Sequence, residues 1–545
     1  MRSQAASSGP AAAPRTAGGT AAGVGRVREL RSRSSVRVGA LTVAAALVYC
    51  LDSLNLFRRF LASTFDLVIF DQGIRGYAHL SAPVSIARGV SDGQGAHLEL
   101  LADHWSPLLA LLAPLYWIHD GPTTLLVAQS VLFALAIPPL WAYTRRRLGP
   151  GAAYFVCVAY ALSLPVMEAV IFDFHEVAFV PVLTAVMVER FDAGKRWPGI
   201  LAAVALLLVK EDMGLLVAGF GGYLLIARWR SEKWTGLAFV AGGIFATWAA
   251  THLLIPAFGG SATFYWAYGQ FGSTPGSALL NVLTHPLHAL YVFVTPSVKA
   301  RTMIGLLAMF GFLPLASPLV IAALPLLAER MLASGYPLWW QAKFQYGAFL
   351  VMILCCAAVD GAARLQRHWP ARWDIWLTYP FSRPAWLRRG GAAWRPATLW
   401  AAGICAAALV YLPSSPFGSL LKPGFYHTNA RMRAAAAAVA RVPAGVEVEA
   451  SNNVGPALSG RDTVLLLDGT PRWAPWVIGD TTGLDFPFCT PTQQAEEVAY
   501  LRAHGYAPVF AADGYVVLHR PADARTAQAL AHPPPAARLH TDICY

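Results

Sequence analysis

The sequence predicts a mainly α-helical membrane protein, a polytopic bundle of about 11 spans followed by a small α/β domain. Of its 545 residues, 56% are hydrophobic and 13% are charged, whereas soluble domains carry about a quarter charged residues. The apolar residues fall into separate runs, and the composition changes after residue 413. These observations divide the chain into three predicted regions, 1–35, 36–413 and 414–545.

The first 35 residues are rich in Ala, Gly, Ser and Arg and show no apolar periodicity, which predicts a disordered basic tail. The first apolar run, 38–57, is not followed by a small-residue cleavage site. We therefore expect it to be a retained first span rather than a removed signal peptide.

The predicted bundle is built from apolar runs of unequal length. Runs of about 20 residues cross the hydrocarbon layer, whereas runs of about 10 to 14 residues are also consistent with re-entrant or interfacial segments. The runs are 38–57, 122–143, 150–172, 176–191, 198–209, 213–228, 234–256, 303–315, 318–331, 346–363 and 397–413.

Clusters of Arg and Lys predict the orientation, because positive residues favour cytoplasmic loops. One assignment places every cluster and the tail in the cytoplasm, if 106–119 is interfacial or re-entrant and 198–228 is two short helices around "KED". The cytoplasmic clusters then account for the net charge of +12, so the charge does not indicate a nucleic-acid partner and we expect none. The clusters are Arg145–Arg147, Lys195 with Arg196, Arg228 with Arg230 and Lys233, and Arg364 with Arg367 and Arg372.

The same assignment gathers ionisable residues on the outer side. They lie in "STFDLVIFDQGIRGY" (63–77), "DFHE" (173–176) and "VKED" (209–212), and the loop 257–302 shares that side. Charges at membrane depth cost about 2.5–3.5 kcal/mol each on insertion scales and are usually paired or functional. We therefore expect these groups to share a water-filled cavity.

Two carboxylates in the first of these segments are the leading candidates for chemistry. Asp66 and Asp71 lie roughly 140° apart around a helix, so they do not share a helical face. We expect one of the two within reach of His104, His175 or Lys210. We favour Asp66, because Asp71 is suited to bracing the following segment through local hydrogen bonds.

Other polar groups nearby allow more than one reading. Asp103 precedes a Pro-initiated helix and is suited to capping it. Asp173, His175 and Glu176 follow one another without a recognised zinc spacing, so a divalent metal is only a weak candidate and the cofactor stays open.

After residue 413 the pattern predicts an α/β domain of roughly 130 residues, which is within the usual domain range. We expect an Ala-rich helix, strands near 446–450 and 463–468, a helix ending near Gly505 and a hairpin turning at 512–514. Cys489 and Cys544 fall in this domain, and a disulfide between them would suit an oxidising outer compartment.

Several collinear segments resemble the bacterial polytopic membrane family catalogued as domain of unknown function 2079, over about residues 60 to 520. In "FQYGAFL", Gln345 stands where the resemblance leads us to expect His, so no role is carried over to it. The segments are "FDLVIFDQ", "DHWSPLLALLAPLYWI", "LLVAQSVLFALAIPPLWAYTRRRLG", "DFHEVAFVPVL", "LLLVKEDMGLLVAGFGGYLL", "FGFLPLASPLVIAALPLLAE", "FQYGAFLVMIL" and "SGRDTVLLLDG" with "GYVVLHR".

This family in turn resembles the GT-C superfamily of membrane glycosyltransferases. The resemblance implies a multi-pass protein of the bacterial plasma membrane that takes a sugar from a polyprenyl-phosphate donor, with an acidic base in the first outer loop. It implies Asp66 or Asp71 as that base and a cation beside the leaving phosphate. The residues it implies for the donor phosphate and cavity are Arg75, His104, Asp173, His175, Lys210, Glu211 and Asp212, with Lys299 and Arg301 as further cations.

Two other classes of function remain. A transporter would use the same ionisable groups as a relay, and it predicts internal repeats, which we do not find between 38–256 and 303–413. A scaffold anchored by the bundle leaves the clustered acids unexplained. The sugar and its acceptor are not specified by the sequence.

Overall fold

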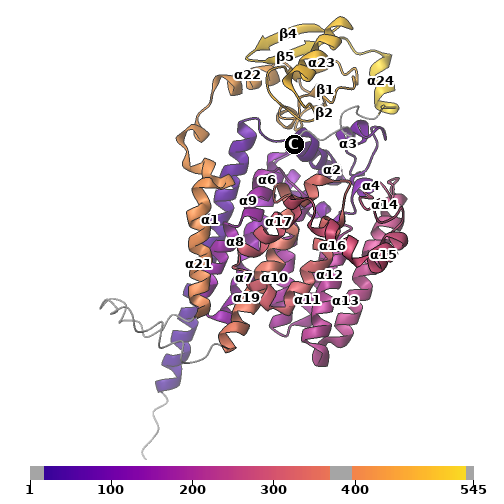
Figure 1. Ribbon diagram of the computed structural model, residues 1–545. Coiled ribbons are helices and arrows are strands. Elements are labelled where there is room, and N and C mark those ends of the chain that lie inside the picture. Colours follow the sequence, from indigo (N-terminus) through magenta and orange to yellow (C-terminus); the bar gives the residue numbers. More distant parts are fainter. Residues whose placement is uncertain (1–17, 369–395, 535–545) are drawn as a thin grey trace, which may run out of the picture.

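The computed structural model describes residues 18–368 and 396–534, which form two parts (Figure 1). A long helical body fills the lower part of the picture, and a five-stranded sheet with its helices lies on its upper end. This is the helical membrane bundle with a small C-terminal α/β domain that the sequence predicts.

Five helical segments are long and apolar enough to cross a membrane. They are Arg33–Arg58 within α1 (Gly18–Arg58); Thr123–Leu148 from α6 (Thr123–Leu135) and α7 (Ile137–Leu148); Trp229–Ala257 from α13 (Trp229–Ala249), η4 (Ala250–Leu254) and α14 (Ile255–Ala257); Phe344–Arg367 from η8 (Phe344–Gly347) and α19 (Ala348–His368); and Pro396–Ser414 from α21 (Pro396–Tyr411) and η10 (Leu412–Ser414).

Two bent helix pairs raise the number of spans to seven if each pair crosses once. The pair α8 (Pro150–Ala161) and α9 (Leu164–Ile171) bends by 40°, and the pair α15 (Pro275–Thr284) and α16 (Pro286–Val294) by 103°. The count is lower than predicted because several apolar runs form helices too short to span the hydrocarbon layer alone.

The remaining helices of the body are shorter. Helices α11 and α12 flank "KED", so the predicted division of 198–228 is confirmed. The segment 257–302, predicted to be a loop, contains helices. The remaining helices of the body are α10 (Phe179–Asp192), α11 (Arg196–Leu206), α12 (Met213–Ala227), α17 (Ser297–Ala308), η5 (Leu313–Ala316), η6 (Pro318–Ala323), α18 (Leu324–Leu332) and η7 (Pro337–Trp340).

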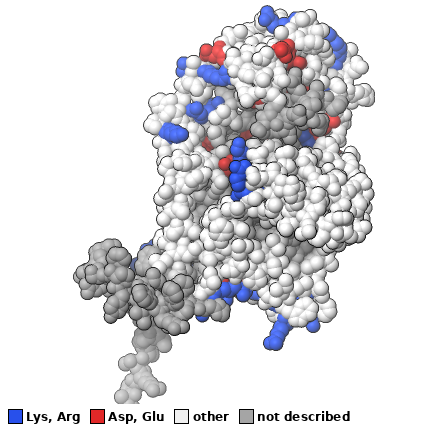
Figure 2. Space-filling model, in the orientation of Figure 1, with Lys and Arg blue, Asp and Glu red and all other residues white. Residues whose placement is uncertain are grey.

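Burial separates the central helix from the peripheral ones. In α19, 89% of the most apolar window is buried, whereas the figures for α1, α13 and α21 are 22%, 22% and 17%. These outer helices leave large apolar side chains such as Leu47 and Val410 exposed, as expected for surfaces that face lipid. Figure 2 shows a middle belt almost free of charged side chains, with charge at both ends.

The predicted cytoplasmic clusters meet at one end of the body. Arg147 pairs with both Asp192 and Asp360, at 2.6 and 3.1 Å, and Arg228 lies 3.6 Å from the same Asp192. Arg364 also pairs with Asp360, at 2.6 Å. The clusters therefore share one end, which lies opposite the sheet domain (Figure 1), while Arg372 falls outside the described residues.

Short helices cover the end that faces the sheet domain. The segment 106–119, expected to be interfacial or re-entrant, forms two of them, η2 and α5. The short helices at this end are η1 (Thr64–Val68), α2 (Ile69–Ala78), α3 (Ile86–Ser91), α4 (Leu100–Asp103), η2 (Pro107–Leu112), α5 (Ala113–Tyr116) and η3 (Glu176–Ala178).

The sheet has the order β2-β1-β3-β5-β4, in which β2, β1 and β3 are parallel and β5 and β4 antiparallel. Strand β3 was not predicted, because it directly follows a proline, Pro475. The elements are α22 (Ala430–Val439), β1 (Glu447–Ala450), η13 (Gly455–Ala457), β2 (Thr463–Leu466), β3 (Trp476–Asp480), α23 (Pro491–Ala503), β4 (Ala507–Ala512), β5 (Tyr515–His519) and α24 (Ala524–Ala531), after the turns η11 (Pro416–Leu421) and η12 (Pro423–Tyr426).

Two predictions concern the chain ends. Helix α1 begins at Gly18, within the tail expected to be disordered, because the Ala, Arg and Leu residues before the span are strong helix formers and extend it. Residues 1–17 lie outside the described residues, and so does Cys544, so its pairing with Cys489 stays a prediction.

Candidate functional site

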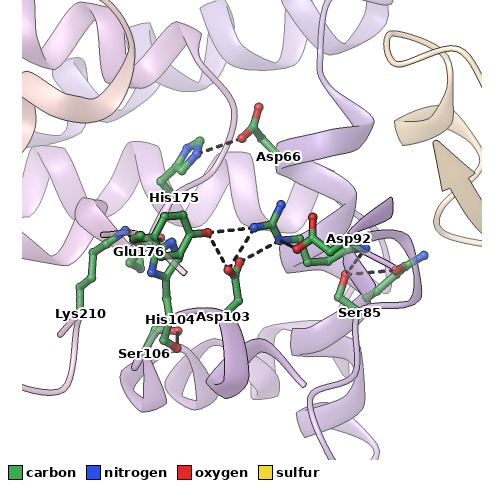
Figure 3. A network of polar contacts seen from close by, with 12 residues as sticks. Asp66, Ser85, Asp92, Asp103, His104, Ser106, His175, Glu176 and Lys210 are labelled. Atoms are coloured by element: carbon green, nitrogen blue, oxygen red, sulfur yellow. Dashed lines mark hydrogen bonds and ion pairs between the residues drawn. The ribbon is translucent and has the colours of Figure 1, made fainter. Parts of the chain in front are cut away.

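Asp66 lies in η1, a single π-helical turn directly after the first span. Its Oδ1 is 3.4 Å from Nε2 of His175, which precedes η3, and Figure 3 shows the two side chains pointing toward each other. The carboxylate of Asp66 is 22% exposed, so it remains accessible. The expected proximity of one acid to a histidine is therefore present for Asp66.

The bend between α9 and η3, which precedes His175, is joined by hydrogen bonds to Ser63, the residue before η1, and to Gln129. Asp173 adopts φ 47°, in the left-handed region that Asp tolerates, and its Oδ2 accepts from the Ser63 amide at 2.7 Å. Gln129 donates to the carbonyl of Asp173 and accepts from the His175 amide. Burial, together with the charge of Asp66, raises the pKa of Asp173 well above its ordinary value. Its hydrogen bond with the Ser63 amide shows that Asp173 supports the turn.

A chain of alternating charges lies beside this pair. Lys210 Nζ donates to Glu176 Oε1 at 2.7 Å and is 3.4 Å from His104 Nε2. The other ring nitrogen of His104 is 2.8 Å from Glu211 Oε1. Lys210, His104 and Glu211 are 18%, 21% and 16% exposed, so all three side chains are partly accessible. The predicted convergence of "DFHE" and "VKED" is present.

A buried arginine joins the site from α3. Arg88 donates to Asp103 through two nitrogens, each at 3.1 Å, and also pairs with Asp92 at 3.1 Å. Tyr265 accepts from Arg88 at 2.9 Å and donates to Asp103 at 2.6 Å. Burial opposes ionisation of Asp103, but the charges of Arg88 and His104 hold its pKa below its ordinary value. Asp103 is therefore an ion-pair partner at the end of α4 and not the expected cap of the Pro-initiated helix η2, whose N-cap is Ser106.

Ring contacts connect the two networks. The His104 ring stacks on the Tyr265 ring with 4.7 Å between centroids, and the Arg88 guanidinium lies 5.3 Å over the ring of Phe65, the neighbour of Asp66. Contacts therefore link Asp66 in η1 with polar groups from α3, α4, η3 and the "KED" break.

Asp71 lies elsewhere and has different partners. Its carboxylate is fully buried, accepts from Tyr116 at 2.7 Å and from Ser459, and pairs with Arg75 at 2.9 Å. Arg75 also contacts Asp120 at 2.6 Å, so its guanidinium is held away from the His175 pair. Asp71 thus braces the sheet domain against α2, and it does so through residues 45 and 388 positions away rather than through the local hydrogen bonds that we expected.

Two further predicted candidates are placed by the structure. Lys299 is buried, donates to three backbone carbonyls and does not contact the cluster, while Arg301 is exposed. Asp212 follows Glu211 at the start of α12 and stays close to it.

Some polar atoms of the site have spare bonding capacity. Glu176 Oε2, His175 Nδ1 and Asp212 Oδ1 are buried and have no hydrogen-bond partner among residues 18–368 and 396–534. Each of these atoms can form a further hydrogen bond, to an ordered water or to a ligand.

The sequence did not point to Arg88 or Tyr265. Arg88 stands in "VSIARGV" as a single cation between apolar residues, which was the available signal, but its partner Tyr265 is 177 residues away. Such a pair becomes visible only when the fold is known.

The described residues contain no group of three or more His, Cys, Asp or Glu side chains placed to hold a metal ion. The acids nearest Asp66 are instead paired with Lys210, His104 or Arg88. We therefore derive no step that uses a metal.

A family model described as "Predicted membrane protein (DUF2079)" matches residues 57–517. Among curated proteins, none matches this chain. Of solved structures, ArnT from Cupriavidus metallidurans bound to undecaprenyl phosphate is similar with a TM-score of 0.46 and 14% identity, covering 89% of this chain and 98% of that one.

Two structures of the Archaeoglobus fulgidus oligosaccharyltransferase are also similar, each at 11% identity over 89% of this chain and 74% of that one. The enzyme tethered to an acceptor peptide has a TM-score of 0.43, and AglB with an inhibitory peptide and a dolichol-phosphate has 0.42.

Proposed function

The chain belongs to the DUF2079 family of predicted membrane proteins, and we propose that it transfers a sugar from a polyprenyl-phosphate donor to an acceptor on the outer face of the bacterial plasma membrane. Asp66 is the general base of this reaction. The observation that carries the proposal is the accessible Asp66 carboxylate, 3.4 Å from His175 and bordered by the Lys210 cluster.

In this mechanism Asp66 removes the proton from the acceptor as the acceptor attacks the anomeric carbon of the sugar. A base in this position contributes roughly 10²–10⁴-fold to the rate. His175 orients the carboxylate through the contact between its Nε2 and Asp66 Oδ1.

Lys210 is the cation best placed to stabilise the phosphate that leaves. The leaving group gains negative charge, and a fixed ammonium beside it lowers the barrier because it needs no reorganisation. Lys210 belongs to the cluster that borders Asp66, whereas Arg75 pairs with Asp71 and Asp120 and Lys299 donates to backbone carbonyls away from that cluster. We therefore retain Lys210 and omit the other two from the phosphate site.

An apolar pocket supports a lipid-linked donor. It has a volume of about 350 Å³, lies between α8, α9, α17 and α21, and is lined by small residues such as Gly305, Ala308 and Gly403. Ligand pockets of about 300–1,000 Å³ are typical for small molecules. The pocket opens among helices that face lipid, so a polyprenyl chain can reach it from the membrane.

One polar residue of the pocket wall is Arg330, which donates to the carbonyl of Tyr346 at 2.8 Å. In the proposed complex the lipid chain occupies this pocket and its phosphate extends toward Lys210.

The test compares Asp66→Asn with the wild-type protein in lipid nanodiscs. Undecaprenyl-phosphate sugars labelled in the sugar are supplied with a cell-envelope extract as acceptor source, and release of undecaprenyl phosphate is measured. We expect the variant to lose about 10²–10⁴-fold in kcat with little change in KM. Asp120→Asn, which removes a half-exposed carboxylate outside the site, is the matched control and should keep wild-type activity.

Full activity of Asp66→Asn would overturn the assignment of the base. If no donor is consumed by the wild-type protein, the transferase proposal itself fails, and a transporter using the same ionisable groups becomes the next hypothesis to test.

A further inference from the structure

The turn that carries Asp66 has an unusual backbone. Residues Thr64–Val68 form a π-helix, a conformation that is rare and frequently found at functional sites. A single turn of this kind has few hydrogen bonds of its own, so contacts from outside must hold it.

One set of contacts comes from the helical body. Ser63 caps the turn by accepting from the Asp66 amide at 3.2 Å, and its own amide donates to Asp173 Oδ2 at 2.7 Å. The orientation of the Ser63 hydroxyl therefore affects the backbone of Asp66 directly.

The second set is four hydrogen bonds that Asn452 of the sheet domain accepts. Its carbonyl oxygen accepts from the amide and the hydroxyl of Thr64, at 2.6 and 2.7 Å. Its side-chain Oδ1 accepts from the Phe65 amide at 2.9 Å and from the Ser63 hydroxyl at 3.0 Å. Asn452 thus contacts each of the three residues before Asp66.

The position of Asn452 is itself fixed by the sheet. It follows β1 at its carboxyl end, and Ser451 beside it donates to Ile478 of β3 through its amide and its hydroxyl. On the other side, the Asn453 amide donates to Asp485 at 3.0 Å, and Phe486 packs on Phe65 with 5.1 Å between centroids. Carboxyl ends of parallel strands are the usual place for functional loops in such sheets.

We propose that Asn452 is a positioning residue for Asp66, through which the sheet domain sets the geometry of the base. The inference rests on the proposed function, in which Asp66 acts on the acceptor. Because Asn452 Oδ1 accepts a hydrogen bond from the Ser63 hydroxyl, a lone pair of that hydroxyl is directed at the Asp66 amide. The same Oδ1 accepts a hydrogen bond from the Phe65 amide and so fixes the peptide that precedes Asp66.

The experiment uses the full chain in nanodiscs and three variants. Asn452→Ala removes the side-chain acceptor, whereas Asn452→Asp keeps an oxygen at the same position. Ser459→Ala is the matched control, because Ser459 also joins the sheet domain to α2, through Asp71, without contacting the turn.

The first readout is hydrogen exchange of the amides of residues 64–70, which needs no substrate. Asn452→Ala should raise exchange there at least tenfold, and Asn452→Asp and Ser459→Ala should leave it near wild type. Unchanged exchange in Asn452→Ala would overturn the inference, since the turn would then hold without this contact.

The second readout separates positioning from folding. With the donor used for Asp66→Asn, Asn452→Ala should lower kcat by about 10–100-fold while KM stays within about threefold, because a misplacement of about 1 Å costs on this scale. Asn452→Asp should recover most of kcat. Raised exchange with an unchanged kcat would show a structural contact only and overturn the inference.

If the wild-type protein consumes no donor, the proposed function fails on its own terms. The exchange readout then still decides whether Asn452 holds the turn, so the two failures are distinguishable.

Discussion

At the scale of single residues, the site depends on charges that compensate each other away from bulk water. Lys210 and Glu176 are 18% and 3% exposed and are joined at 2.7 Å. Removing one member of such a buried pair leaves the other without its counter-charge, which is far more costly than losing an exposed pair.

We therefore expect Lys210→Met to destabilise the protein by about 3–5 kcal/mol, since it isolates the Glu176 carboxylate. The double variant Lys210→Met with Glu176→Gln should regain most of this loss, because a neutral amide needs no cation. Thermal unfolding of the purified protein in detergent measures both. Lys233→Met, at an exposed lysine that lies over Trp234, is the control and should change stability by less than about 0.5 kcal/mol.

Equal losses in the single and the double variant would contradict this account. They would mean that the methylene stem of Lys210, and not its charge, stabilises the fold.

Residue types and short-range patterns pointed to most of the site, but its pairing came only from the fold. "DFHE" and "VKED" were recognisable as ionisable groups in apolar surroundings, because such groups are rare at membrane depth. The contact between Asp66 and His175 joins residues more than 100 positions apart, and helical periodicity carries no information over that separation.

At the scale of elements, a close helix crossing supports the "KED" segment. Helices α12 and α13 pack so closely that a Cβ on Gly214 would lie 2.2 Å from the carbonyl oxygen of Gly243, and a Cβ on Gly243 2.3 Å from that of Gly214. Because α12 begins directly after Asp212, the distance between these helices also sets the position of Lys210 and Glu211.

Gly243→Ala should therefore push α12 and α13 apart and lower the melting temperature by several degrees, since overpacking costs about 1–3 kcal/mol. Gly242→Ala is the matched control in the same helix, because a Cβ there meets nothing within 4 Å, and it should be neutral or slightly stabilising. Differential scanning fluorimetry of the two variants in detergent compares them. Equal melting temperatures would show that the crossing relaxes without cost.

Apolar runs predicted where the helices lie but not how many of them cross the membrane. A run of 10 to 17 residues has the same composition whether it crosses the hydrocarbon layer or stops within it. In the sheet domain, alternation and turn residues predicted β1, β2, β4, β5 and α23. Strand β3 was missed because it directly follows Pro475 and gains its stability from β1 and β5 on either side.

At the scale of the whole molecule, charge is distributed between two ends with an apolar belt between them (Figure 2). The clustered arginines are tied together by Asp192 and Asp360 at the end opposite the sheet domain. This arrangement supports our proposal that the N-terminal end is cytoplasmic and the sheet domain external.

Reporter fusions at residue 36 and after residue 420 should accordingly report opposite sides of the membrane. A reporter that is active only in the cytoplasm and another that is active only outside it should give complementary signals at both positions. The same sidedness at the two positions would contradict the orientation and with it the outer location of Asp66.

The contact between Asn452 and the turn before Asp66 has a consequence for biosynthesis. Ser63 and Asn452 are 389 positions apart, and the last long helix of the body, α21, ends at Tyr411, so the ribosome makes the residue that fixes this turn only after the helical body. Because chains fold progressively from their N-terminus during synthesis, the Asp66 turn acquires its last hydrogen bonds only after the sheet domain has formed. The protein thus passes through membrane insertion with this turn still unlocked and completes it as one of the final events of its maturation.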